Sequence, residues 1–488
     1  MGGGKGKNNA NGFPFDRRRT LPMGISNSGV NCWYSSLSQL LFHIPAARRA
    51  IFEIQPYSGN DSHKNRCWRM CKELQLQFAI MQDRHQDSVS PIASLSAMND
   101  LFPGDGVQYE QKDAVEMFTR LLSFLETITE SASKESPLTE IFGGVVHDLK
   151  FENGVFQWHV PAGKKEIFSF ALNPSLGNLH SAMEDVFAKS DHQRWIAEAA
   201  PVLLLPIARY TYHGGVVRKK NDRFEFPQEI FLDRYMSANM ERVFMAKSQF
   251  ESSQSTAAHY RGRLAKLNPV SNNQKLGLIS SFLKYFEFLR DNWGRISDDT
   301  RRKREELEIR QHLSRYESMP NQLEGDEFKK IPYDLHVVIM HCGSAQSGHY
   351  YAYARRPHYT SGSEWLCCND SFIGEVTWDD VAREAFGRQS TSAFALLYIR
   401  RSEFDRLYDY ENLLNTNVDD CLLDPMKCLP EHVKRMLQAH YGWTEQASDK
   451  PRKFAKRKGE EEKDVNMPVF STTGEQQNSK RDRRNKLR

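Results

Sequence analysis

The feature that most constrains the fold is a long polar helical stretch with strand-like sequence on both sides. Short apolar runs split by Gly, Pro and Asn, which are typical of strands, occur between residues 141 and 232 and again from Leu335 to Arg400. Between them, from about Asp233 to Phe328, the sequence turns helical and much more polar. Strands on either side of an insertion can share one sheet. We therefore predict one mixed α+β domain that is interrupted by a helical insertion.

The insertion contains two different kinds of predicted helix. Residues 276–289 present an apolar face with no obvious intramolecular partner, made by Leu278, Ile279, Phe282, Leu283, Phe286 and Leu289. Residues 298–316 form a charged helix with little to bury. A helix that is polar nearly all round usually bridges through solvent or pairs with a partner.

Both ends of the chain are predicted to lack order. Residues 1–20 are Gly/Asn-rich and then basic, and a helical extension over 403–446 precedes a tail over 447–488 with 13 Lys/Arg against 7 Asp/Glu. The net charge of +4 therefore belongs to the tail. Such a run is more often an import signal or a solvated tail than a nucleic-acid site. With no stretch of about 18 apolar residues, we expect no membrane segment and a location in the cytoplasm, the nucleus or both.

The cysteines do not suggest a disulfide framework or a zinc site. Eight are spread irregularly, and no C-x-x-C pair occurs. Cys67 and Cys71 lie four apart on a predicted helix, which could clip a metal, but two buried thiols explain them better. We therefore predict neither a metal nor a cofactor.

One cysteine lies in a sequence suited to nucleophilic chemistry. In GISNSGVNCW (24–33), glycines and asparagines lead into the first turn of an apolar helix that Pro45 closes. Asn31 is a natural N-cap, which would place Cys32 at the positive end of the helix dipole, where the thiolate is favoured. The alternative is that Cys32 is merely a small buried residue.

A histidine and an amide could complete such a site. A Gly/Ser loop delivers His349 to the start of an aromatic-rich strand, and Asn369-Asp370 follows twenty residues later. An Asn or Asp there could hold one imidazole nitrogen and leave the other free to deprotonate a thiol. Taken singly, His349 could equally be structural and Asn369-Asp370 a turn. Their order, Cys then His then Asn, is the order of a papain-like site.

These segments resemble the ubiquitin-specific protease family. GISNSGVNCW is similar to its cysteine box, QKDAVEMF (111–118) to its Q-Q-D-A-x-E-F-L segment, and SGHYYAYARR with the later W-x-x-x-N-D to its histidine box. The resemblance covers residues 21–401 except the insertion. The flanks and position of the insertion resemble the ubiquitin carboxyl-terminal hydrolase 25 and 28 subgroup.

The resemblance implies a function and a role for each matching residue. The family removes ubiquitin from proteins by thiol-dependent hydrolysis after its C-terminal glycine. Cys32 would be the nucleophile, His349 the base, Asn369 the group that orients it with Asp370 as helper, and Asn27 the oxyanion-hole amide. The matching positions imply substrate contacts at Asp113, Glu116 and Tyr350. For Asp113 and Glu116 the alternative is a solvated helix face.

The resemblance also implies a papain-like fold with thumb, palm and fingers. Residues 21–232 would supply the thumb and fingers, with the β-rich stretch near 141–230 as fingers, and residues 329–402 the palm. Residues 233–328 would be an all-helical arm through which copies self-associate, as in the subgroup. Ubiquitin and ubiquitinated proteins would be the partners.

The sequence also departs from the family pattern. Val30-Asn31 replaces the usual Asn-Thr before the cysteine, and the family's zinc-binding cysteine pairs are missing. With about 20 residues before the cysteine box, the subgroup's N-terminal ubiquitin-interacting helices are not expected. Val30-Asn31 keeps one alternative open, a ubiquitin-binding scaffold of the same fold with impaired catalysis.

Overall fold

The structure is a computed structural model of the whole chain. It describes residues 22–27, 29–83, 86, 88–104, 110–129, 135–152, 155–159, 165–168, 170–187, 192–267, 301–319, 321–345, 347–356, 364–387, 389–408 and 429–442. The predictions for residues 1–20, for the apolar face over 276–289 and for the tail over 447–488 lie outside the described residues.

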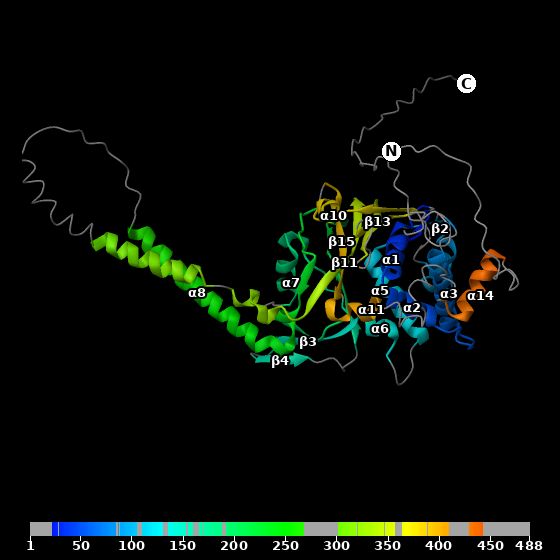
Figure 1. Cartoon of the computed structure of the whole chain (residues 1–488), viewed down its shortest axis with the longest axis horizontal. Coiled ribbons are helices and arrows are strands. Elements are labelled where there is room, and N and C mark those ends of the chain that lie inside the picture. The colour runs from blue at the N-terminus through cyan, green and yellow to red at the C-terminus, as the bar shows by residue number, and fades with distance from the viewer. Residues whose placement is uncertain are drawn as a thin grey trace, which may run out of the picture. The chain divides into compact units, whose positions relative to one another are not determined.

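A large antiparallel sheet forms the centre of the molecule (Figure 1). Its strands follow the order β14-β13-β12-β11-β15-β7, and β10 pairs with β11 off this path. Strands from before and after the insertion therefore share one sheet, as the sequence predicts. The strands are β7 (Val202–Pro206), β10 (Glu229–Phe231), β11 (Pro332–Gly343), β12 (Gly348–Arg355), β13 (Trp365–Asn369), β14 (Phe372–Val376) and β15 (Thr391–Arg400).

The sheet is covered on both faces, which explains its apolar strands. Successive side chains on a strand point to opposite faces. In β11, Val337 and Ile339 belong to one core, whereas Val338 and Met340 belong to the other. A strand buried on both faces reads as a continuous apolar run, which is how this segment stands out in the sequence.

One face of the sheet packs against a group of helices that we call the helical layer. All eleven residues of its central helix, α1, are buried. Pro45 ends the α1 region as predicted, but it also occupies the first turn of a second helix, where proline is favoured. The helices are α1 (Cys32–Phe42), α2 (Pro45–Glu53), α3 (Ser62–Asp83), α4 (Ile92–Leu101), α5 (Ala114–Thr129), α6 (Pro137–Phe142), α11 (Phe404–Tyr408) and α14 (Glu431–Tyr441).

Within the predicted extension over 403–446, the structure describes two helices, α11 and α14. Leu407 of α11 is buried, and α14 packs on α3 through the buried Val433 and Leu437. Cys67 and Cys71 of α3 are fully buried, as predicted for two packed thiols.

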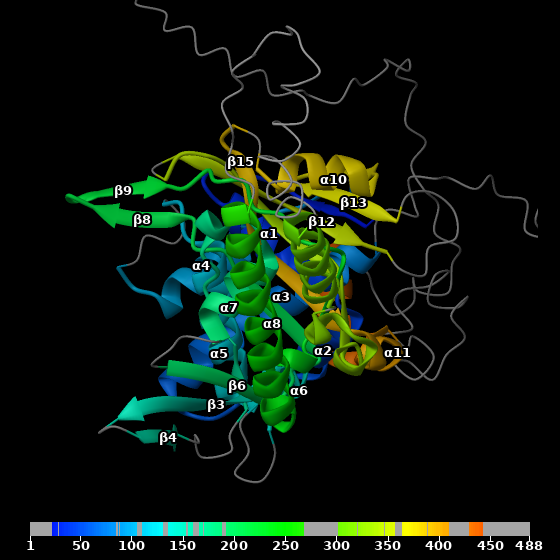
Figure 2. The ribbon, with the colours of Figure 1, turned by 90° about the vertical axis from the view of Figure 1, so that its left-hand side faces the viewer.

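The β-rich stretch near 141–230 is not a single region, which corrects the prediction that it forms the fingers as a whole. β3, β4, β5 and β6 make a small sheet, and β8 and β9 make a separate hairpin (Figure 2). β7 and β10 join the large sheet, because β7 is apolar enough to be buried. The strands not yet bounded are β3 (Gly143–Glu152), β4 (Val155–His159), β5 (Glu166–Ile167), β6 (His192–Glu198), β8 (Tyr210–His213) and β9 (Val216–Lys219).

A helix that the strand pattern concealed lies in the same stretch. α7 (Leu179–Phe187) buries Leu179, Ala182, Met183 and Phe187, which recur at helical spacing. Together with α10 (Trp378–Ala385), it packs in the core on the other face of the large sheet.

The insertion begins as a helical hairpin, which we call the arm. α8 (Met240–Leu267) runs antiparallel to a helix over residues 301–317, so the predicted charged helix has a partner within the chain. The two are joined by ring stacking of Tyr260 on His312 at 5.3 Å and by ion pairs of Arg261 with Glu317 at 2.7 Å and of Arg263 with Glu305 at 2.9 Å.

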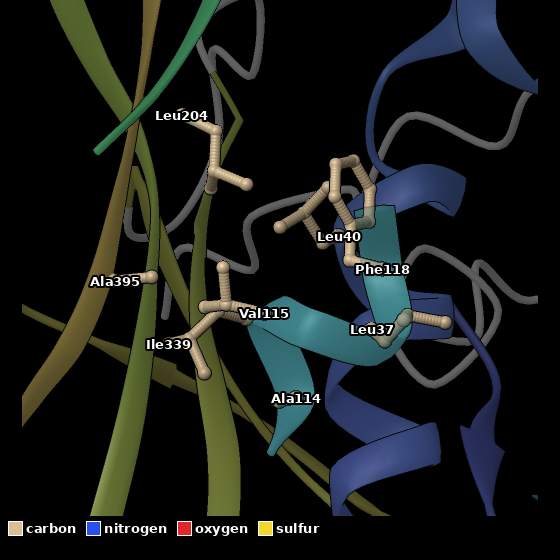
Figure 3. A pocket seen from close by; sticks show the side chains of 8 residues that line it. All are labelled: Leu37, Leu40, Ala114, Val115, Phe118, Leu204, Ile339 and Ala395. Carbon is tan, nitrogen blue, oxygen red and sulfur yellow. The ribbon is translucent and has the colours of Figure 1, made fainter. Parts of the chain in front are cut away.

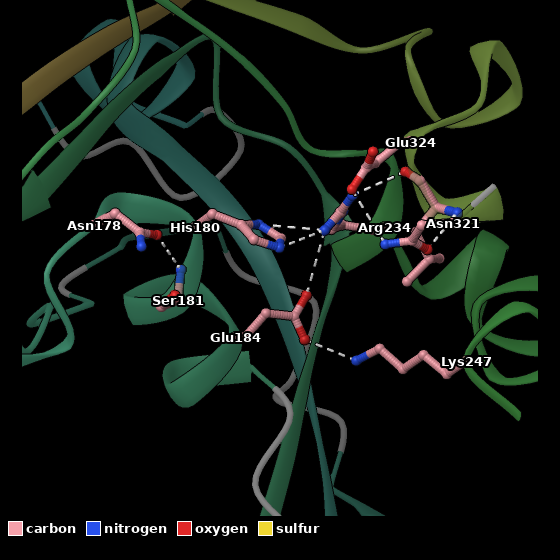
Figure 4. A network of polar contacts seen from close by, with 9 residues as sticks. Asn178, His180, Ser181, Glu184, Arg234, Lys247, Asn321 and Glu324 are labelled. Carbon is pink, nitrogen blue, oxygen red and sulfur yellow. Dashed lines mark hydrogen bonds and ion pairs between the residues drawn. The ribbon is translucent and has the colours of Figure 1, made fainter. Parts of the chain in front are cut away.

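A polar network fixes the base of the arm to α7 (Figure 4). Arg234 donates to the Leu323 carbonyl at 2.8 Å and lies 3.8 Å from Glu184, which also pairs with Lys247 of α8 at 2.8 Å. Burial, and secondarily the Arg234 charge, lower the pKa of His180, the histidine beside Arg234. Among the described residues, no helix is long and apolar enough to cross a membrane.

Candidate active site

The loop before Cys32 lies directly against the turn between β13 and β14. Gly24 begins β1 (Gly24–Ile25), which pairs with β2 (Ser88–Val89), and the Ile25 amide donates to the Asp370 carbonyl at 2.8 Å. A Cβ at Gly24 would lie 2.3 Å from the Ser371 carbonyl oxygen. Only glycine permits this approach, so the sequence brings the cysteine loop and the Asp370 turn together.

Cys32 is the first residue of α1 and is 3% exposed. Its sulfur accepts a hydrogen bond from the backbone N–H of Tyr350 at 3.3 Å. Asn31 occupies the N-cap position as predicted, but its side chain does not cap the helix. Its amide instead donates to the Ser26 carbonyl at 3.4 Å, because the chain folds back over itself before the helix starts.

His349 lies near the start of β12, with Asn369 and Asp370 beside its ring. Its Nε2 donates to Asn369 Oδ1 at 2.7 Å and lies 3.7 Å from Asp370 Oδ2. The neighbouring Cys32 side chain, followed by the bond to Asn369, raises the pKa of His349 to about 9 against the opposing effect of burial. A raised imidazole pKa favours the imidazolium form beside the sulfur.

Asn369 and Asp370 form the end of β13 and the turn to β14. Asp370 has a positive φ of 51°, a conformation that Asp tolerates better than most residues. The pair therefore makes a turn and also directs side chains toward His349. Burial raises the pKa of the Asp370 carboxyl, whereas the bond from Asn27 and the charge of His349 oppose this.

Asn27 is exposed and bonded to Asp370. Its Nδ2 donates to Asp370 Oδ2 at 2.9 Å, and its Oδ1 accepts from the Gly29 amide at 2.9 Å. A carboxamide nitrogen carries two hydrogens, so one of them can still reach another acceptor.

Asp113 and Glu116 lie at the start of α5. Asp113 Oδ1 accepts from the backbone N–H groups of Val115 at 2.9 Å and Glu116 at 3.1 Å, which is helix capping that the sequence did not predict. Burial raises the pKa of Asp113 against these two bonds. Glu116 is exposed and pairs with Arg120 at 3.4 Å.

Tyr350 does not fit the predicted substrate contact through its side chain. The ring is 1% exposed and packs on Phe394, because residues alternate between faces and Tyr350 points into the core shared with α1. Its hydroxyl lies 3.2 Å from that of Tyr210, and burial raises its pKa well above the usual range.

Two residues next to the site were not predicted from the sequence. Gln111 hydrogen-bonds the backbone of Gly348, and the buried His341 contacts the Tyr210 hydroxyl at 3.3 Å. Burial lowers the pKa of His341 to about 3. Gln111 opens the quoted segment QKDAVEMF, which was the one available signal.

A small apolar cavity lies among α1, α5 and the large sheet (Figure 3). It has a volume of only about 10 Å³ and no ionisable lining group. Its lining residues are Leu37, Leu40, Ala114, Val115, Phe118, Leu204, Ile339 and Ala395. Within the residues that the structure describes, no cluster of three or more His, Cys, Asp or Glu side chains could hold a metal ion.

Comparison with known proteins assigns the chain to a family. The model of the family "Ubiquitin carboxyl-terminal hydrolase" matches residues 23–398. The chain therefore belongs to the ubiquitin carboxyl-terminal hydrolase family, as its motifs predict.

The relatives agree with the predicted subgroup. The chain is 22% identical to human ubiquitin carboxyl-terminal hydrolase 28 over 519 residues, covering 79% of this chain and 46% of that protein. It is 21% identical to the chicken (Gallus gallus) protein of the same name, covering 78% and 47%. Human ubiquitin carboxyl-terminal hydrolase 34 is 24% identical over 76% of this chain and 9% of its own length. The chain thus spans about half the length of the hydrolase 28 relatives.

Proposed function

We propose that this chain is a deubiquitinating enzyme that hydrolyses the peptide or isopeptide bond after the C-terminal glycine of ubiquitin. What supports this most is that three distant segments meet at one place: His349 bonds Asn369 at 2.7 Å, and the sulfur of Cys32 accepts a bond from the backbone N–H of Tyr350, the residue after His349. The family membership and the names of the relatives support the same reaction.

In the first half of the proposed reaction, His349 takes the thiol proton of Cys32. The sulfur attacks the carbonyl carbon that follows the Gly-Gly tail of ubiquitin, and a tetrahedral oxyanion forms. His349 then returns the proton to the lysine amine of the substrate, the carbon–nitrogen bond breaks, and a thioester remains on Cys32. Asn369 bonds Nε2, which would leave the other ring nitrogen free to face the sulfur.

In the second half, water replaces the amine. His349 accepts a proton from the water as its oxygen attacks the thioester carbon. The carbon–sulfur bond then breaks, the carboxylate of ubiquitin is released, and the proton returns to the sulfur of Cys32. We assign the oxyanion contact to the backbone N–H at the start of α1 and to the second amide hydrogen of Asn27. Asp370 would orient that amide through the 2.9 Å bond.

The start of α5 suits the basic tail of ubiquitin. Glu116 is exposed, and Asp113 has a carboxylate oxygen that is not used for capping. We propose that both accept charge-assisted hydrogen bonds from arginines of that tail. Globular ubiquitin would then be held by the small sheet of β3 to β6.

We further propose that the architecture is papain-like. The helical layer corresponds to the thumb, the large sheet to the palm and the small sheet to the fingers. The catalytic domain would comprise 21–232 and 329–402, and the tail over 447–488 could direct import into the nucleus. Unchanged location after deletion of the tail would contradict that last point.

The arm is our candidate for self-association. Exposed apolar side chains on its described part, Phe244, Met245 and Leu307, support this role. Light scattering of the full chain and of a variant lacking 240–317 tests the proposal. The same monomeric mass for both would contradict it.

The test of the proposed activity is turnover of ubiquitin that carries a fluorogenic amide at its C-terminus. We expect turnover by the wild type and none by Cys32→Ala. The alternative, an impaired scaffold, would bind ubiquitin without releasing the fluorophore. Parallel assays with ubiquitin-like modifiers define which modifier is the substrate.

A further inference from the structure

Resting on the proposed function, we propose that Gln111 is a positioning residue for His349. Its side chain ties the start of the helical layer's α5 to the strand that carries the histidine. Gln111 therefore controls the proton chemistry of the site without touching the substrate or the sulfur.

The contact is a matched pair of hydrogen bonds. Gln111 Nε2 donates to the Gly348 carbonyl at 2.7 Å, and Gln111 Oε1 accepts from the Gly348 amide at 3.1 Å. The two residues are 237 positions apart. A side-chain amide that bonds both groups of one residue fixes the position and the tilt of that peptide, and the next residue is His349.

The Gly348 backbone also lies close to a buried side chain. A Cβ on Gly348 would lie 2.3 Å from the buried His341 Nε2, so the backbone already touches the ring. On the other side of the loop, Gly343 has a φ of 112° and Ser344 exchanges hydrogen bonds with Ser347. The loop is therefore compact, and Gln111 holds the end of it that leads into His349.

The position of Gln111 links this loop to the helical layer. Two residues later, Asp113 caps α5, so the backbone that carries Gln111 is itself anchored. Two neutral hydrogen bonds contribute little net stability. Their effect on rate should be larger, since misplacement of a catalytic group by about 1 Å can cost about 100-fold.

Two substitutions separate positioning from general packing. Gln111→Ala removes both bonds. Gln111→Glu keeps the shape and the acceptor but, while ionised, sets an oxygen against the Gly348 carbonyl. The matched control is Gln75→Ala, since Gln75 is also in the helical layer and donates to the carbonyls of Ile51 and Ile54, remote from the loop.

The first measurement is turnover of the ubiquitin amide by the full chain as a function of pH. We expect kcat to fall about 10- to 100-fold for Gln111→Ala with KM changed less than about 3-fold. The ratio of Gln111→Glu to wild-type turnover should rise as the pH falls toward about 5, because a protonated carboxyl can again donate. Folded Gln75→Ala should keep wild-type kcat and pH dependence.

The second measurement does not depend on activity. The imidazole of His349 is titrated by NMR in the wild type and in both Gln111 variants. We expect its pKa to be about 9 in the wild type and closer to 6.5 in Gln111→Ala. Unchanged His349 titration together with wild-type kcat in Gln111→Ala would overturn the proposal. A wild type that titrates as expected but does not turn over ubiquitin would overturn the proposed function instead.

Discussion

The two sides of the candidate site are held in place in different ways. His349 lies on β12, which is paired with β11 on one side and β13 on the other. Cys32 begins a buried helix, but the loop that delivers it exposes Asn27 and Val30 and contains Gly29 at a φ of 150°. The histidine is therefore fixed by a ladder of backbone hydrogen bonds, whereas the described residues of the cysteine loop form no such ladder beyond the short β1–β2 pair.

The large sheet therefore positions the cysteine loop. The loop meets the Asp370 turn at three points, through the close approach of Gly24, the backbone bond of Ile25 and the side chain of Asn27. Changes on the sheet side should alter the proton chemistry, and changes on the loop side should alter the placement of the sulfur.

The largest effect is expected from Cys32→Ala, which removes the nucleophile. Turnover of the ubiquitin amide should fall by more than about 1,000-fold, while the folded structure is retained because alanine fits a small buried position. Cys67→Ala, another buried cysteine of the helical layer, is the control and should keep its activity. Residual thiol-dependent turnover in Cys32→Ala would show that a different cysteine is the nucleophile.

Asn369→Ala tests the sheet side of the comparison. Loss of the 2.7 Å bond to His349 should lower turnover by about 100-fold and move the alkaline limb of the pH profile below pH 9. The sign follows from the need for a protonated His349 at amine release, so activity is lost as the pH rises through the pKa of His349. The kinetic pH profile checks this, and an unshifted alkaline limb would contradict the role of Asn369.

Low pH should lower the stability of the folded chain, because a buried histidine of the large sheet would have to take up a proton. His336 of β11 is 2% exposed, and burial lowers its pKa to about 4. The unfolded chain therefore binds the proton more tightly, and stability falls as the pH drops from about 6.5 toward 4. Between pH 7 and pH 5 we expect a loss of about 2 kcal/mol from this residue.

Urea unfolding of the wild type and of His336→Gln at both pH values measures that loss. The glutamine variant should lose about 2 kcal/mol less than the wild type between the two conditions. Equal losses in the two proteins would mean that His336 does not titrate as a buried neutral group.

Gly24→Ala tests the loop side and should have the smallest effect. The added Cβ would collide with the Ser371 backbone, so the loop should move and turnover fall about 10-fold, with the alkaline limb unchanged. Gly262→Ala, on α8 with open space around it, is the matched control and should leave turnover unchanged. A shifted alkaline limb in Gly24→Ala would show that the two sides are not separable.

The sequence predicts much of this site because each motif combines chemistry with a local structural signal. The Gly-rich approach to an apolar helix placed Cys32, and the Gly/Ser loop before an aromatic strand placed His349. A sheet that spans the insertion also follows from sequence, because strand-like runs occur on both sides of the insertion. The residues themselves suggested that Asn369 or Asp370 could hold one imidazole nitrogen of His349, and the family motifs assigned that role to Asn369.

The errors concern side-chain contacts and burial that a local sequence pattern does not specify. Asn31 bonds backward to Ser26 instead of capping, and Tyr350 is buried because strand alternation directs it inward. The contact of Gln111 was not predicted because its partner, Gly348, lies 237 residues away. The sequence pattern groups the strands after residue 141 into one region. Their burial, which a local pattern does not specify, divides them between two sheets and a hairpin.

The most direct test of the central claim is covalent capture followed by peptide mapping. Ubiquitin with a C-terminal electrophile is incubated with the full chain, and the modified residue is identified by mass spectrometry. We expect a single adduct on Cys32 that Cys32→Ala abolishes and His349→Ala slows strongly. An adduct on another cysteine, or no adduct from a folded wild type that binds ubiquitin, would contradict the account.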